Sequence, residues 1–166
     1  MRTGQLLFIA TFLLANLALC SAVLAHGDGE AHAEAATGNS YNPASSGTRN
    51  LVAGPVVIRM LADASNLGSD QIEVGELNLP KGFGESDAHA HTSLEIFYVV
   101  EGVLGHTVNG TAHRLSPGML GFVKPGDSVK HAVLSDGPVR ALVIWVPGGE
   151  AQRLVDHAGF ASEPVK

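Results

Sequence analysis

Two histidines separated by one residue, and a glutamate shortly after them, are the residues of this chain best placed to do chemistry. His89 and His91 are two positions apart, so in an extended strand both imidazoles point to the same face. Glu95 lies an even number of positions further on, so continued extension would bring its carboxylate to that face as well. His131 occurs in a later β-prone run, just after a turn pattern at residues 124–127, and a closed barrel would bring it across to the first three.

These four residues, referred to below as the four-residue set, provide three imidazoles and one carboxylate. Such donors suit one divalent transition metal (Fe, Mn, Ni, Co, Cu or Zn) and leave a coordination position open for water or substrate. The alternative is that these are ordinary surface histidines near a sheet edge, as a lone H-x-H would be. The spacing of Glu95 and the later His131 favour the metal site, in which Glu95 is also the candidate catalytic base.

The segments that must position this set are short β-prone runs separated by Gly, Pro, Asn and Asp. They lie at residues 56–60, 72–79, 94–101, 103–108, 113–115, 120–123, 129–134 and 139–146. Many short strands with such punctuation predict an all-β sandwich or barrel. Residues 150–157, which follow two glycines, form the only segment with the pattern of a short helix. No phosphate-binding glycine motif opens a helix, so a nucleotide-binding fold has no support.

The clearest turn is Asn109-Gly110, a dipeptide that favours the type I′ turn of a β-hairpin. A two-residue loop at this point places His106 directly opposite His113. Two facing imidazoles could form a second metal site or a proton relay. The alternative is a plain cross-strand contact, which is what such pairs usually are.

The first 25 residues have the pattern of a secretory signal peptide, with Arg2 before an apolar run and small residues before Ala25. Cleavage after Ala25 would leave a flexible leader at residues 26–50 and a domain at residues 51–160, in a secreted or periplasmic protein. An uncleaved membrane anchor is the alternative. The only cysteine, Cys20, would leave with the signal peptide, so the domain must be stable without disulfides.

Composition bounds the partners of the chain. Its 166 residues suit one domain, and 45% hydrophobic residues are enough for a core. The formal net charge of −6, with no cluster of basic residues, disfavours nucleic acid as a partner. A small-molecule substrate is the partner that the predicted metal site, with its open position, would bind.

The segment from His89 to Gly102 resembles the first sequence motif of the cupin family, with H-x-H, three residues, Glu, six residues and Gly. The second cupin motif is looser in this chain. Gly118 and Gly126 match it, but Lys124 stands where proline is usual, and His131 follows Gly126 by four residues rather than two. An insertion of two residues preserves strand alternation, so His131 can still face inward. The resemblance covers residues 56–147.

This resemblance implies a cupin double-stranded β-helix, or jelly-roll barrel, with a short C-terminal helix and a metal held inside by the four-residue set. It also implies pairing of two chains into a homodimer. Similarity to the dioxygenase cupins predicts an oxidoreductase acting on a small oxygen-bearing molecule. The alternatives are a non-redox isomerase or hydrolase-like enzyme and a non-catalytic module that binds a small molecule or a metal. The candidate cavity walls are Phe97, Tyr98, Phe122, Val133 and Trp145.

Overall fold

Antiparallel strands are the main secondary structure of the computed structural model, which describes residues 44–165. The predicted signal peptide and most of the predicted leader lie outside these described residues. The strands are β1 (Arg49–Ala53), β2 (Val56–Ala62), β3 (Glu73–Leu79), β4 (Leu94–Glu101), β5 (Leu104–Val108), β6 (Thr111–Leu115), β7 (Leu120–Val123), β8 (Val129–Val133), β9 (Val139–Val146) and β10 (Ala161–Glu163). The helices are α1 (Ala64–Leu67) and α2 (Glu150–His157).

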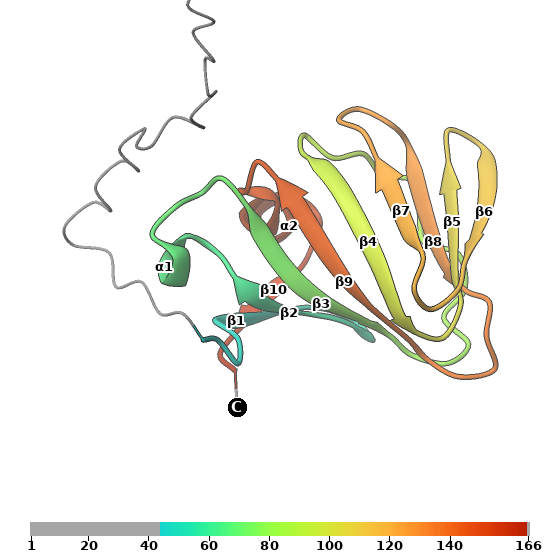
Figure 1. The fold of residues 1–166 in the computed structure, drawn as a ribbon, viewed down its shortest axis with the longest axis horizontal. Helices are drawn as coiled ribbons and strands as arrows, with labels where there is room; N and C mark the ends of the chain where they lie inside the picture. Colours follow the sequence, from blue (N-terminus) through green and yellow to red (C-terminus); the bar gives the residue numbers. More distant parts are fainter. Residues whose placement is uncertain (1–43, 166) are drawn as a thin grey trace, which may run out of the picture. The chain divides into compact units, whose positions relative to one another are not determined.

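The strands form two sheets that face each other (Figure 1). The larger sheet has seven strands in the order β10-β1-β2-β3-β9-β4-β7, and the smaller has three in the order β6-β5-β8. Neighbours within each sheet run antiparallel, and several are far apart in sequence, such as β3 beside β9 and β5 beside β8. This arrangement confirms the predicted all-β jelly roll.

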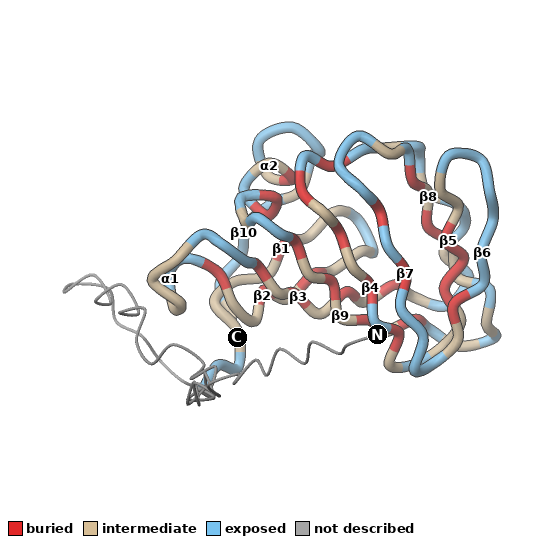
Figure 2. Tube along the Cα trace, turned by 45° about the horizontal axis from the view of Figure 1, so that its top comes forward, coloured by how far each residue is buried: buried red, intermediate tan, exposed pale blue. Residues whose placement is uncertain are grey.

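Alternation along the central strands places the core between the two sheets. On β9, Val139, Ala141, Val143 and Trp145 are buried, while the residues between them are at least partly exposed. Figure 2 shows the same alternation of buried and accessible positions along β4 and β9. Since successive side chains of a strand point to opposite faces, one face of the large sheet fills the barrel and the other faces outward.

The outward side of β7, β4 and β9 is unusually apolar. Leu120 and Phe122 on β7 are 49% and 55% exposed, and Tyr98 on β4 is 40% exposed. Tyr98 pairs with Leu120, and Ile96 pairs with Phe122, so these side chains share one face. We refer to this surface as the outer apolar face. It comprises Ile96, Tyr98, Leu120, Phe122, Leu142, Ile144 and Val146.

The outer apolar face corrects part of the predicted cavity wall. Tyr98 and Phe122 had been expected to line the cavity, but their strand positions turn them to the outside. Val133 packs against the core and does not line the cavity. Phe97 and Trp145 do line it, as predicted. The predicted alternation is present, but which face of each strand points inward is fixed by strand pairing, which the sequence does not show.

The hairpin between β5 and β6 forms as predicted. Asn109 and Gly110 both have positive φ, 49° and 81°, the conformation that a type I′ turn requires. The resulting register pairs His106 with His113. It also pairs His106 with His131 on the other side of β5, so a row of histidines crosses the small sheet.

Helix α2 forms at the predicted residues. Its N-cap is Gly149, which has no side chain to cap the helix. The Glu73 carboxylate of β3 accepts a hydrogen bond of 2.9 Å from the backbone N–H of Ala151 instead. Ala151 and Leu154 are buried in the core. The helix is therefore attached to the barrel at its first turn. In the described part of the chain, neither helix has the length and apolarity needed to cross a membrane.

Candidate metal centre and cavity

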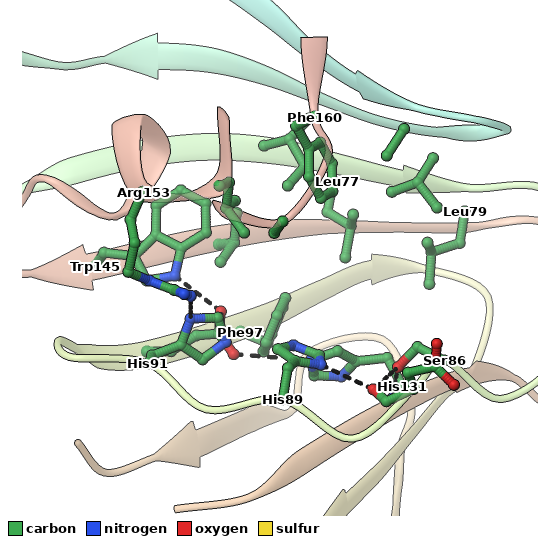
Figure 3. A pocket seen from close by; sticks show the side chains of 18 of the residues that line it. Leu77, Leu79, Ser86, His89, His91, Phe97, His131, Trp145, Arg153 and Phe160 are labelled. Carbon is green, nitrogen blue, oxygen red and sulfur yellow. Dashed lines mark hydrogen bonds and ion pairs between the residues drawn. The ribbon is translucent and has the colours of Figure 1, made fainter. Parts of the chain in front are cut away.

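The fold brings the four-residue set together from both sheets. Glu95 lies on β4 of the large sheet, and His131 lies on β8 of the small one. His89 and His91 precede β4, and His89 is tied to β8 by two backbone hydrogen bonds with Val129, of 3.0 and 2.8 Å. This bridge places the H-x-H segment beside His131. All four residues line one cavity (Figure 3).

Glu95 is the centre of the set. Its Oε2 lies 3.1 Å from His91 Nε2, and its Oε1 lies 3.7 Å from His131 Nε2. The His89 ring is 5.0 Å from the His91 ring and 5.4 Å from the His131 ring, measured between centroids. Two imidazoles thus contact the carboxylate, and the third, His89, lies beside both of them and is the most exposed of the three.

The donor atoms of the set fit a metal by type and by their lack of other partners. His91 Nε2, His131 Nε2 and Glu95 Oε1 are buried and make no hydrogen bond, and their only polar neighbours are members of the set itself. Buried polar atoms without partners are rare and need an explanation, and a bound ion is one. The donor atoms do not converge on one point: in residues 44–165, no group of three or more His, Cys, Asp or Glu is arranged to hold an ion. His91 and Glu95 instead form an ion pair with each other.

The electrostatics of the set follow from this pairing. Burial would lower the pKa of His91, but the neighbouring carboxylates of Glu150 and Glu95 outweigh burial and raise that pKa to about 9. Burial would raise the pKa of Glu95, but His131 and His91 hold it far below its usual range. Burial lowers the pKa of His89. Without a metal, the site therefore holds an ionised carboxylate beside a protonated imidazole.

Two residues outside the predicted set hold its members in place. Trp145 Nε1 donates a hydrogen bond of 2.8 Å to Glu95 Oε2, and both side chains are buried. This bond fixes one carboxylate oxygen and leaves Oε1 free. Glu150 Oε1 lies 2.9 Å from His91 Nδ1, on the far side of the ring from Glu95. The sequence predicts Trp145 only as a cavity wall and Glu150 only as the first residue of the helix.

His106, next to the set, is a third buried imidazole beside His91 and His131. Its ring stacks on His131 with centroids 5.4 Å apart, and it does not line the cavity. Burial and the nearby His131 lower the pKa of His106 to about 4, so this ring is neutral near pH 7. Its predicted partner His113 pairs with it in register but is exposed. The ring of His106 therefore contacts His131 rather than His113, and only the order of strands in the sheet could have revealed this contact.

The cavity beside the set has a volume of about 610 Å³, within the range of sites that bind small molecules. One end carries the histidines and Glu95. The opposite walls are mostly apolar and come from β2, β3, β9 and the region of α2; they include Ile58, Leu77, Leu79, Val143, Leu154 and Phe160. Arg153 and His157 of α2 also border it. Figure 3 shows the polar cluster on one side and Leu77, Leu79 and Phe160 on the other.

A two-sheet jelly roll with histidines and a glutamate lining a cavity is the architecture of the cupin class. Comparisons with known proteins support this assignment. The sequence profile of the Cupin domain matches residues 75–147, and the chain belongs to the cupin family. No curated protein matches the sequence.

Several solved structures share the fold. A predicted oxalate decarboxylase from Thermotoga maritima is 16% identical, with a TM-score of 0.54 over 61% of this chain and 94% of that one. An RmlC-like cupin from Shewanella frigidimarina is 22% identical, with a TM-score of 0.52 over 68% and 93%. KdgF from Halomonas sp. is 17% identical, with a TM-score of 0.53 over 61% and 86%. At these identities the likeness shows the fold alone.

Proposed function

We propose that this cupin is a metal-dependent oxidoreductase of the dioxygenase type that acts on a small oxygen-bearing molecule. The observation that carries the proposal is the meeting of three imidazoles and one carboxylate, with buried donor atoms that make no hydrogen bond, on one wall of a cavity of about 610 Å³. His89, His91, Glu95 and His131 would hold one divalent transition metal. Such a metal supplies Lewis acidity and, for Fe, Mn, Ni or Cu, access to redox chemistry.

The residues of the chain would divide the remaining work. Trp145 holds Glu95 Oε2, so Oε1 is the oxygen left for the metal. If Glu95 instead leaves the metal, this same oxygen would accept a proton from a substrate hydroxyl. The apolar walls would exclude water and receive an apolar substrate body, while the histidine end would receive its oxygen-bearing group. A substrate with an apolar body therefore fits this cavity better than a small dianion does.

A non-catalytic binding module is the second candidate function. The specific observation in its favour is that the described donors form an ion pair rather than a ready metal cluster. In that case the cavity would hold a small molecule without chemistry. A non-redox isomerase or hydrolase-like enzyme would use the same residues with a metal such as zinc.

Elemental analysis of the full-length protein and of its Glu95→Gln variant tests the proposal. We expect about one equivalent of Fe, Mn, Ni or Cu in the wild type and a loss of that metal in the variant. The control is Glu163→Gln, which changes an exposed carboxylate on β10. Oxygen uptake with phenolic substrates would then support the redox reading. Zinc would favour the non-redox enzyme, and no metal in either protein would favour the binding module.

Export and self-association complete the proposal. We infer secretion or periplasmic localisation from the sequence pattern of residues 1–25, which lie outside the described residues. The outer apolar face supports pairing with a second copy, because outward residues of antiparallel strands that face water are normally polar. β7 is an edge strand of the large sheet, so its exposed backbone groups lie beside this face.

A further inference from the structure

Glu150, the first residue of α2, is a fully buried carboxylate outside the four-residue set, with 0% of its surface exposed. Burying a charge is costly unless it is paired and hydrogen-bonded. Glu150 has three partners. Its oxygens lie 2.9 Å from His91 Nδ1 and 3.1 Å from Thr92 Oγ1, and the Arg153 guanidinium one turn along the helix donates to it. The cost is thus offset by contacts that converge on the H-x-H segment.

The position of this carboxylate is fixed by the attachment of the helix. Ala151 N–H bonds to the buried Glu73, and Gly148 N–H donates a bond of 2.8 Å to the backbone oxygen of Asp70. Leu154 packs into the core on the following turn. Glu150 is therefore held at a set place beside His91 by the barrel.

The contact determines which nitrogen of His91 is available. A carboxylate accepts hydrogen bonds, so the 2.9 Å contact with Glu150 requires the proton on Nδ1, and the Arg153 guanidinium, which can only donate, lies farther from that nitrogen at 3.4 Å. Nε2 then faces Glu95, on the side of the ring where the metal is proposed. His89 has a weaker counterpart, since its Nδ1 bonds to the backbone oxygen of Asp87 at 3.0 Å. His131 Nδ1 has no hydrogen-bond partner.

We propose that Glu150 is a positioning residue for the metal centre: it fixes the His91 ring, keeps the proton on Nδ1 and makes Nε2 a stronger donor, while Arg153 and Thr92 hold its carboxylate in place. This inference rests on the proposed metal site. A carboxylate behind a metal-binding histidine is worth about 10- to 100-fold in metal affinity in proteins where it has been removed. One short helix beyond the barrel strands would thus tune a centre built by the barrel.

The competing explanation is that Glu150 only stabilises the start of α2 through its pair with Arg153. A helix-stabilising role would change the free energy of unfolding and leave the metal coordination unaltered. A positioning role would also change the affinity and the spectrum of the bound ion. The test must therefore measure all three.

The experiment uses the full-length protein stripped of metal, with Cu²⁺ as the probe. We expect Glu150→Gln, which keeps the shape of the side chain and removes its charge, to bind Cu²⁺ about 10- to 100-fold more weakly in a competition titration with a chelator. Its Cu²⁺ EPR spectrum should also shift. The matched control is Asp156→Asn, which removes an exposed carboxylate from the same helix, and it should bind as the wild type does.

Wild-type affinity and an unchanged EPR spectrum in folded Glu150→Gln would overturn the inference while leaving the metal site intact. Failure of the wild type to bind Cu²⁺ would instead overturn the metal site, and the inference with it. If Glu150→Gln does not fold, Thr92→Val decides the question, because it removes one hydrogen bond to the carboxylate at an exposed position. A severalfold loss of Cu²⁺ affinity there supports the inference, and none overturns it.

Discussion

The metal-free protein should be most stable near pH 6.5 and should lose stability as the pH rises toward 9. The cause is His91, whose pKa is about 9 in the folded protein and 6.5 in an unfolded chain. Between these values the folded state binds a proton that the unfolded state does not. Stability contributed by a raised pKa is complete below the unfolded value and is lost as the pH passes through the folded one.

The magnitude follows from the size of the shift. When a group is protonated only in the folded state, the free energy of unfolding falls by at most about 1.4 kcal/mol for each unit by which the pH rises. Over the interval from pH 6.5 to 9, His91 accounts for a loss of about 3 kcal/mol. That is a large fraction of the stability of a typical domain.

Stability should also fall on the acid side. The pKa of His106 is lowered to about 4, so the unfolded chain binds a proton between pH 6.5 and 4 that the folded protein does not. The lowered pKa values of Glu95 and Glu150 act in the same direction below pH 4.5, because their paired carboxylates must then be protonated. The maximum near pH 6.5 is where the two limbs meet.

Urea unfolding of the chelator-treated protein, followed by tryptophan fluorescence from pH 4 to 9, measures this profile. Glu150→Gln removes a carboxylate that raises the pKa of His91, so its alkaline limb should be shallower. Asp156→Asn should keep the full slope. A free energy of unfolding that is flat or rising between pH 7 and 9 in metal-free wild type would refute the assignment of a protonated His91 facing Glu95.

Three further predictions concern other parts of the molecule. His131→Ala should release most of the metal seen by elemental analysis, and full retention would remove His131 from the ligand set. Gly102→Ala should cost at least about 2 kcal/mol in urea unfolding, because Gly102 has a φ of 77° and an added Cβ would lie 2.2 Å from the Pro138 backbone oxygen. Phe122→Lys on the outer apolar face should convert a dimer to a monomer in light scattering with little effect on metal content, and a wild type that is monomeric at all concentrations would contradict the proposed pairing.

Local sequence patterns predicted much of the fold. Period-two alternation gave eight of the ten described strands but missed β1, β10 and the short helix α1. Asn109-Gly110 gave the hairpin and its register, and Gly148-Gly149 marked the start of α2. The spacing from His89 to Glu95 predicted that three residues of the set would meet, and they do line one cavity, although the chain bends at residues 92–93 and is not extended throughout. These signals depend only on the backbone geometry of neighbouring residues, so one sequence is enough to read them.

The contacts that hold the set in place could not be predicted in the same way. Glu150 meets His91 across 59 positions of sequence, and Trp145 meets Glu95 across 50. Neither pair has a spacing that a local rule could recognise, because the order of strands in the sheet brings them together. The outward direction of Tyr98 and Phe122 was missed for a related reason, since shifting a strand by one residue exchanges its two faces.

The place where the family match ends has a practical consequence. The Cupin domain match stops at Pro147, just before the helix that carries Glu150, Arg153 and Leu154. A chain cut after Pro147 would keep all four proposed ligands and would pass as a complete cupin by its motifs. It would nevertheless lose the carboxylate behind His91 and part of the cavity wall. The carboxylate behind His91 therefore lies outside the segment that identifies the family, so a domain boundary drawn from the match alone would leave it out.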